Sequence, residues 1–155
     1  MINDLRLAES LLDGDYDSVQ AQLDYKIKST MTAGIAETLQ PETVNIIGVD
    51  GGDSHHQFAN YLTLIETQTN AIIHLDDSLV FCVSSSSPIH YSIDLGTPFS
   101  VFSIGRSETV CLGGGKWELN GEDLEPSSQG LHNVAVAKEL TISCKTGNLL
   151  IFIAR

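Results

Sequence analysis

The sequence has little positive charge. Its 155 residues include 8 Lys and Arg against 20 Asp and Glu, which gives a formal net charge of −12. A surface that binds nucleic acid needs clustered Lys and Arg, so the composition argues against nucleic acid as a direct partner. Anionic membrane surfaces are disfavoured for the same reason. The imbalance is strongest at the start of the chain, because residues 1–53 contain ten acids and three bases.

Cysteine is also scarce, and long apolar runs are missing. Cys82, Cys111 and Cys144 are far apart and have no Cys-x-x-Cys spacing. They indicate buried free thiols in a reducing compartment rather than a disulfide framework. No run approaches the ~18 apolar residues of a membrane-spanning helix, and the first ten residues, MINDLRLAES, lack the apolar centre of a secretory signal. We therefore expect synthesis in a cytoplasm.

The sequence does contain enough apolar residues for an ordered domain, at 42% of the chain with a mean hydropathy of +0.05. Residues 1–41 have the spacing of two amphipathic helices that are broken at Gly14. The second helix would present an apolar stripe to a partner, and Pro41 would end it. Its predicted interface residues are Val19, Leu23, Ile27, Met31, Ile35 and Leu39.

Residues 42–155 have a different pattern, with about ten short apolar runs separated by turn signals. This pattern predicts an antiparallel β domain, either a sandwich, a jelly roll or a barrel. Within it, residues 48–57 are expected to form a loop, and the runs at 60–66 and 71–75 a hairpin. The fold class is therefore mainly β, with an acidic helical arm at 1–41 and a β domain at 42–155.

Two sets of side chains are weak candidates for a metal site. Asp50 and Asp53 lie close together in an acidic loop, which is more simply explained as a solvated turn. The second set comprises His74, His90 and His132, which lie in different predicted strands. A β-barrel can gather such histidines, but a His-x-His pair is missing, so strand histidines without a metal are the simpler interpretation.

No catalytic residue and no cofactor is predicted. The run CLGGGKW at 111–117 lacks the Ser or Thr that follows the lysine of a phosphate loop, and Ser84–Ser87 lack a nucleophile-elbow pattern. Cys82 has no basic neighbours that would lower its pKa. Trp117, Tyr91 and Tyr61 could form a sugar-stacking face, but aromatic residues are only 6% of the chain.

One segment resembles a known family. The stretch LAESLLDGDYDSVQAQLDYKIKSTMTAGIAETL, at 7–39, resembles a helical segment of prohead core and scaffold proteins of tailed bacteriophages. There a short helix leads through Gly-Asp and an aromatic residue, here Gly14 to Tyr16, into a long acidic helix. The β domain departs from a pure scaffold protein. The whole plan instead resembles capsid decoration proteins, in which a small β domain attaches to capsid subunits.

The resemblance implies a virion structural protein, not an enzyme, that is synthesised in the host cytoplasm and binds capsid or other virion proteins. The helices need a partner to bury their apolar stripe, which can be the β domain of the same chain, another copy or another protein. A homo-oligomer is expected among these. Two alternatives remain: a cupin-like or jelly-roll metalloenzyme that uses the histidines, and a receptor- or ligand-binding β module of a fibre or baseplate.

Overall fold

The computed structural model describes residues 43–50, 53–67 and 70–155. The predicted arm at 1–41 and its interface residues Val19, Leu23, Ile27, Met31, Ile35 and Leu39 lie outside these ranges, so they remain predictions. The chain divides after Asp76 into two compact units. Within the described ranges, no helix has both the length and the apolar character needed to cross a membrane.

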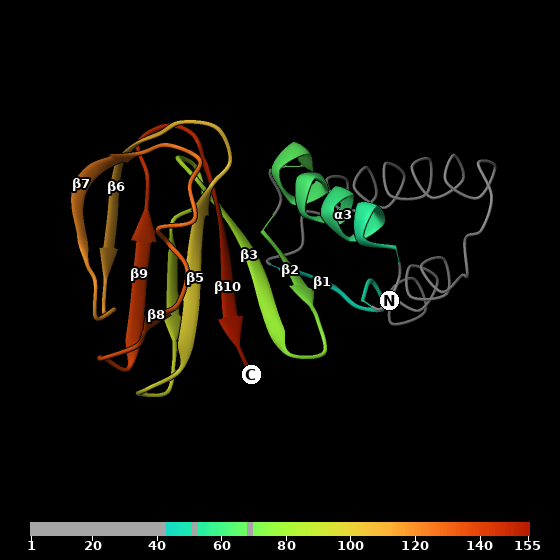
Figure 1. Cartoon of the computed structure of the whole chain (residues 1–155), viewed down its shortest axis with the longest axis horizontal. Coiled ribbons are helices and arrows are strands. Elements are labelled where there is room, and N and C mark those ends of the chain that lie inside the picture. The colour runs from blue at the N-terminus through green and yellow to red at the C-terminus, as the bar shows by residue number, and fades with distance from the viewer. Residues whose placement is uncertain (1–42, 51–52, 68–69) are drawn as a thin grey trace. The chain divides into compact units, whose positions relative to one another are not determined.

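The described part of the first unit is a β-α-β segment. Strands β1 (Val44–Ile46) and β2 (Ala71–His74) pair in parallel, with Val44 opposite Ala71, and helix α3 (Ser54–Thr67) connects them (Figure 1). A parallel pair needs such a crossover connection. The predicted hairpin of 60–66 with 71–75 is therefore wrong, because residues 60–66 are helical.

Two local features explain why a helix forms there. The Asp53 carboxylate accepts a hydrogen bond from the His55 amide at 2.8 Å, and the Asp53 carbonyl accepts one from the Gln57 amide at 3.0 Å. Asp53 thus caps the first turn of α3 and satisfies a donor that would otherwise lack a partner. Asn60 and Leu64 are one helical turn apart, and both are buried.

The second unit is a β-sandwich of two antiparallel sheets. Within this unit, the first sheet has the order β3-β10-β5-β8 and the second the order β4-β9-β6-β7. The strands of the first sheet are β3 (Ser78–Ser84), β5 (Pro98–Ser103), β8 (Asn133–Val134) and β10 (Asn148–Ala154). Those of the second are β4 (Ile89–Ser92), β6 (Ser107–Gly113), β7 (Leu119–Leu124) and β9 (Glu139–Ser143). Figure 1 shows both sheets of this unit.

The core of the second unit lies between its sheets. Along β10, Leu149, Ile151 and Ile153 alternate onto one face and are each at most 2% exposed. Ile151 pairs with Phe81 of β3, and the Phe81 ring meets Tyr91 of the second sheet edge to face, with centroids 5.1 Å apart. The prediction of a mainly β, sandwich-like fold of about ten strands is confirmed.

The β6–β7 pair is irregular. Its register shifts twice, between Ser107 and Val110 and again between Val110 and Cys111. Thr109 has a φ of 52° and Gly121 a φ of 95°, so both strands leave ordinary strand geometry at neighbouring positions. Only glycine adopts such a φ without strain, which accounts for Gly121 but not for Thr109.

Candidate functional site

A pocket of ≈ 390 Å³ lies in the second unit. Strands β5, β6, β7 and β8 contribute to its wall, together with the loops that follow β6 and β7. Ligand pockets generally combine an apolar lining with a few fixed polar groups, and this pocket has that composition. Its lining residues are Val101, Ser103, Leu112, Trp117, Leu119, Leu124, Glu125, Ser127, Gln129, Gly130, Leu131 and Asn133.

Trp117 is the main aromatic residue of the pocket, and Asn133 fixes its backbone. Asn133 is buried, and its amide nitrogen donates to the Trp117 carbonyl at 2.8 Å. Its amide oxygen accepts from the Trp117 amide at 3.2 Å and from the Val134 amide at 2.9 Å. The Asn133 side chain thus provides hydrogen-bond partners for both backbone groups of Trp117. The Trp117 side chain itself is 56% exposed and so remains available to a ligand.

Two glycines allow neighbouring segments of the pocket wall to pack closely against each other. A Cβ added to Gly115 would lie 2.8 Å from the Phe99 ring and 2.9 Å from the Asn133 side-chain nitrogen. A Cβ added to Gly130 would lie 1.7 Å from the Val101 carbonyl oxygen. The Gly130 carbonyl accepts a hydrogen bond from the Val101 amide at 2.9 Å, which ties the loop to β5. The pocket wall therefore depends on the missing side chains at both positions.

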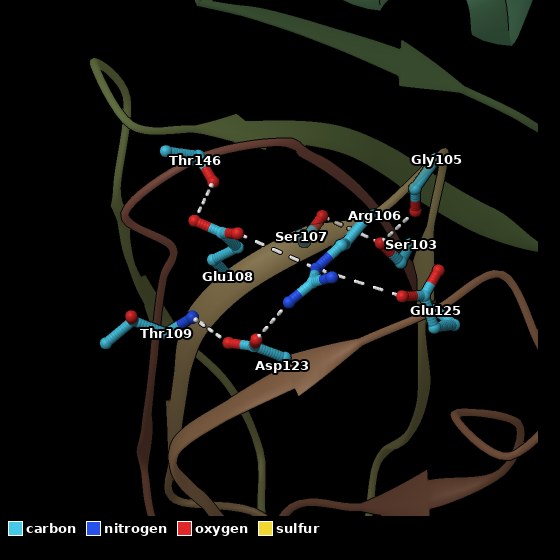
Figure 2. A network of polar contacts seen from close by, with 9 residues as sticks. All are labelled: Ser103, Gly105, Arg106, Ser107, Glu108, Thr109, Asp123, Glu125 and Thr146. Carbon is cyan, nitrogen blue, oxygen red and sulfur yellow. Dashed lines mark hydrogen bonds and ion pairs between the residues drawn. The ribbon is translucent and has the colours of Figure 1, made fainter.

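A group of charged residues lies at the β6–β7 edge of the pocket, and Figure 2 shows its contacts. Arg106 donates to Asp123 at 2.8 Å, and its Nε lies 3.6 Å from Glu108 and 3.8 Å from Glu125. Asp123 also accepts the Thr109 amide at 3.0 Å. We call Arg106, Glu108, Asp123 and Glu125 the Arg106 cluster. Its formal charge is −2, since three carboxylates surround one guanidinium.

The cluster shifts the pKa values of its members. The Thr109 amide, and then Arg106, lower the pKa of Asp123 because each stabilises the ionised carboxylate. The hydrogen bond to Asp123 and the surrounding carboxylates raise the pKa of Arg106 further above its ordinary value. Asp123 thus satisfies an amide that the bulge at Thr109 removes from the strand ladder. Glu125 is the one member that also lines the pocket.

Ser103 places a hydroxyl on the pocket wall. This hydroxyl donates to the Gly105 carbonyl at 2.7 Å, and its oxygen lies 2.7 Å from the Ser107 hydroxyl. Ser107 is fully buried and donates to the Asn148 carbonyl at 3.3 Å. Because these bonds hold its proton, Ser103 faces the pocket chiefly as a hydrogen-bond acceptor. Among the residues that the structure describes, the printed partners of the Ser103 hydroxyl are the Gly105 carbonyl and the Ser107 hydroxyl, neither of which is a base, so these bonds do not describe an activated nucleophile.

The lining as a whole favours one class of ligand. Glu125 is its only charged residue, and none of the lining residues is Lys or Arg. Lys116, next in sequence to Trp117, has its Nζ 4.8 Å from the centre of the indole ring. A Trp face and a carboxylate attract planar and cationic groups. A phosphate would meet repulsion from Glu125.

In the first unit, Asp50 ties the loop after β1 to two other segments. One carboxylate oxygen accepts from the Gln57 side chain at 3.0 Å, and the other from the Asp76 amide at 2.8 Å. The candidate residues Asp50 and Asp53 thus hold the start of α3 and the end of β2. The sequence pattern predicts a solvated turn at these positions and gives no sign of these roles.

The three candidate histidines do not come together. His74 in the first unit lies 2.8 Å from the Asn45 side chain. In the second unit, His90 of β4 lies 3.3 Å from Glu139 of β9. His132 is in a left-handed turn, and its amide donates to Ser100. Across residues 43–50, 53–67 and 70–155, no group of three or more His, Cys, Asp or Glu side chains could hold a metal ion.

From the sequence, Trp117 is a candidate only as one of three aromatic residues of a sugar-stacking face. Tyr91 instead packs on Phe81, and Tyr61 belongs to the other unit, on α3. The pocket was missed because its lining spans residues 101–133 and has no compact motif. A weak signal was available: a lone Trp followed a run of glycines.

The comparisons with known proteins concern the fold. No protein-family model matches the sequence, and no curated protein matches it. Solved structures do match. Thiamine pyrophosphokinase from Bacillus subtilis has a TM-score of 0.72 and 18% identity, covering 91% of this chain and 76% of that one. The enzyme from Geobacillus thermodenitrificans has a TM-score of 0.71 and 16% identity. A thiamine pyrophosphokinase family protein from Enterococcus faecalis has a TM-score of 0.69 and 14% identity.

The last two matches each cover 92% of this chain, but only 64% and 66% of the matched proteins. At such identities the likeness establishes the fold alone. It nevertheless overturns the phage-head resemblance, which rested on about 35 residues of degenerate helical pattern. The likeness extends over more than nine tenths of the chain, including the β-sandwich.

The predictions that depended on that resemblance are wrong. They are the virion structural function, the capsid and decoration assignments, the virion localisation and the absence of enzymatic activity. Each is contradicted because the shared fold is that of thiamine pyrophosphokinases, which are enzymes. The alternatives of a cupin-like metalloenzyme and of a fibre or baseplate module receive no support either. The expected partners and homo-oligomer remain predictions.

Proposed function

We propose that the chain acts as an enzyme of the thiamine pyrophosphokinase type, and that the pocket of the second unit binds the acceptor, thiamine. The observation that carries the proposal is the pocket itself, in which Trp117 and Glu125 line one cavity without any Lys or Arg. The fold likeness supports the reaction class, since the neighbouring structures are named for transfer of a pyrophosphoryl group to thiamine.

Thiamine has the features that this lining would recognise. It contains two aromatic rings, one of which, the thiazolium, carries a permanent positive charge, and its hydroxyl is the atom that accepts the pyrophosphoryl group. An exposed indole offers a face for a ring of this kind. The volume of ≈ 390 Å³ lies within the range of small-molecule pockets, about 300–1,000 Å³.

The chain's own residues would bind and orient the acceptor. Trp117 would stack on a ring, and Asn133 would keep the Trp117 backbone in place through the bonds described above. Ser103 would accept a hydrogen bond from a donor such as the amino group of the pyrimidine. The phosphate donor is expected to bind elsewhere, because its charge would be repelled by Glu125.

The experiment uses Trp117 as its own reporter, because it is the only tryptophan in the sequence. Thiamine is titrated into the full chain while indole emission is recorded, and formation of thiamine diphosphate is measured with a nucleoside triphosphate and Mg²⁺ present. We expect saturable quenching and product. If emission does not change and no product forms, the proposal is wrong.

A pair of matched variants tests whether thiamine binds in this pocket. Leu131→Ala shortens a half-exposed lining residue, whereas Leu95→Ala shortens an exposed leucine that does not line the pocket. We expect Leu131→Ala to weaken thiamine binding about fivefold, since it removes roughly 1 kcal/mol of apolar contact. Leu95→Ala should leave binding unchanged. Equal effects of both changes would place the ligand outside this pocket.

A further inference from the structure

We propose that Glu125 makes this pocket select for positive charge, so that a cationic ring binds in preference to a neutral ring of the same shape. This inference rests on the proposed function, because it concerns the same pocket. It goes further by assigning the charge preference to one carboxylate, Glu125, and by giving Lys116 the opposite effect on it.

Glu125 is held less firmly than the other carboxylates of the cluster. Its oxygen lies 3.8 Å from Arg106, whereas Asp123 lies at 2.8 Å and Glu108 at 3.6 Å. Its side chain is 68% exposed, and it follows directly after β7 on the pocket wall. Such a long, exposed ion pair is weak, so Glu125 can exchange Arg106 for a ligand cation at little cost.

The Arg106 cluster has an excess of negative charge. Arg106 is hydrogen-bonded to Asp123, and the four residues together have a formal charge of −2. A cationic ligand beside Glu125 would reduce this excess. An anionic ligand would add to it. Because the Glu125 side chain is largely exposed, solvent screens its attraction for a ligand cation, and a modest preference is expected.

Trp117 already binds a cation. The Lys116 ammonium lies over its ring, 4.8 Å from the centroid. This contact indicates that the indole stabilises positive charge at this position. Lys116 would repel a ligand cation, so its removal should favour binding. Glu125 and Lys116 therefore set the charge preference in opposite directions.

The experiment compares two probes in the full chain by Trp117 emission. One is thiamine, and the other is its neutral isostere in which thiophene replaces the thiazolium ring. We expect the unmodified protein to prefer thiamine, and Glu125→Gln to weaken thiamine about fivefold, as for a solvent-screened ion pair. The neutral probe should bind Glu125→Gln and the unmodified protein equally.

Three further variants serve as controls. Glu108→Gln removes the same charge from the same cluster, but Glu108 does not line the pocket, so thiamine affinity should change less than twofold. Glu125→Asp keeps the charge and should keep the preference. Lys116→Met should tighten thiamine binding, by about twofold, and leave the neutral probe unchanged.

The outcomes separate the two proposals. If both probes bind equally well and Glu125→Gln affects neither, the charge preference is refuted while the pocket assignment stands. If Glu108→Gln and Glu125→Gln weaken thiamine alike, the cluster acts only at a distance and Glu125 has no special role. If neither probe binds the unmodified protein, the proposed function fails and this inference fails with it.

Discussion

The two sheets of the second unit are built differently. In the first sheet, β10 pairs with β3 over seven consecutive residues without a register shift, from Asn148 opposite Ser84 to Ala154 opposite Ser78. In the second sheet, the β6–β7 pair shifts register twice and includes a residue with positive φ, Thr109. The strands of the regular sheet contain most of the buried apolar residues of this unit, whereas the irregular β6–β7 pair carries the Arg106 cluster, of which Glu125 lines the pocket.

The comparison predicts that the regular sheet carries most of the stability. Ile151→Ala, at a fully buried position of β10, should lower the free energy of unfolding by about 2–5 kcal/mol, because it leaves a cavity. Cys111→Ala, at an exposed position of β6, should change it by less than about 0.5 kcal/mol. Urea denaturation measures both. A similar loss for the two variants would break the comparison.

The cysteine thiols of the two sheets should differ in reactivity. Burial raises the pKa of Cys82 on β3 to about 11, whereas Cys111 on β6 is exposed. A thiol with a raised pKa holds less of the reactive thiolate. We expect iodoacetamide at about pH 8 to alkylate Cys82 on the order of 100-fold more slowly than Cys111. Peptide mass spectrometry follows the rates, which should converge in denaturing urea.

Asn133 should have an effect of intermediate size. Asn133→Ala removes three hydrogen bonds and leaves the Trp117 backbone groups without partners, so the free energy of unfolding should fall by about 1–3 kcal/mol. The emission of Trp117 should change as well. Asn120→Ala, on the exposed face of β7, is the control and should alter neither. Unchanged emission would mean that Asn133 does not position Trp117.

The smallest expected effect concerns Asp123. Its pKa is lowered in the folded protein, so its ionised form contributes stability above its ordinary value of 3.8. That contribution is lost as the pH falls through the lowered pKa. Asp123→Asn should therefore reduce the urea midpoint at about pH 6 and lose this difference once the pH is below the lowered pKa. Asp94→Asn is the control. A difference that persists at acid pH would exclude ionisation as its cause.

Strand patterns in the sequence predicted the sandwich well. The apolar run LLIFI at 149–153 is one of the predicted short strands, and it forms most of β10, where Leu149 and Ile151 are fully buried. Helix α3 was missed because its aromatic and branched residues favour a strand when considered alone. The Asp53 cap was a visible helix signal. The parallel pairing of β1 with β2 outweighs this local propensity. These two strands are far apart in the sequence, so the local pattern does not reveal their contact.

The pocket could not be predicted in the same way. Glu125 follows β7 and Trp117 follows β6, and both line one pocket because these strands pair and because Gly130 approaches Val101 closely. None of these features has a fixed spacing in the sequence. Asn133 gave no signal of its own, since its partners are backbone groups whose positions depend on the fold.

The place of β10 has a consequence for synthesis. β3 and β5 each pair with β10 on opposite sides, so the strand that joins them is the last of the three to be made. A nascent chain that has emerged only as far as β9 therefore lacks the central strand of its first sheet. Such a chain exposes apolar strand edges to its surroundings, and chaperone binding or aggregation competes with folding during that interval.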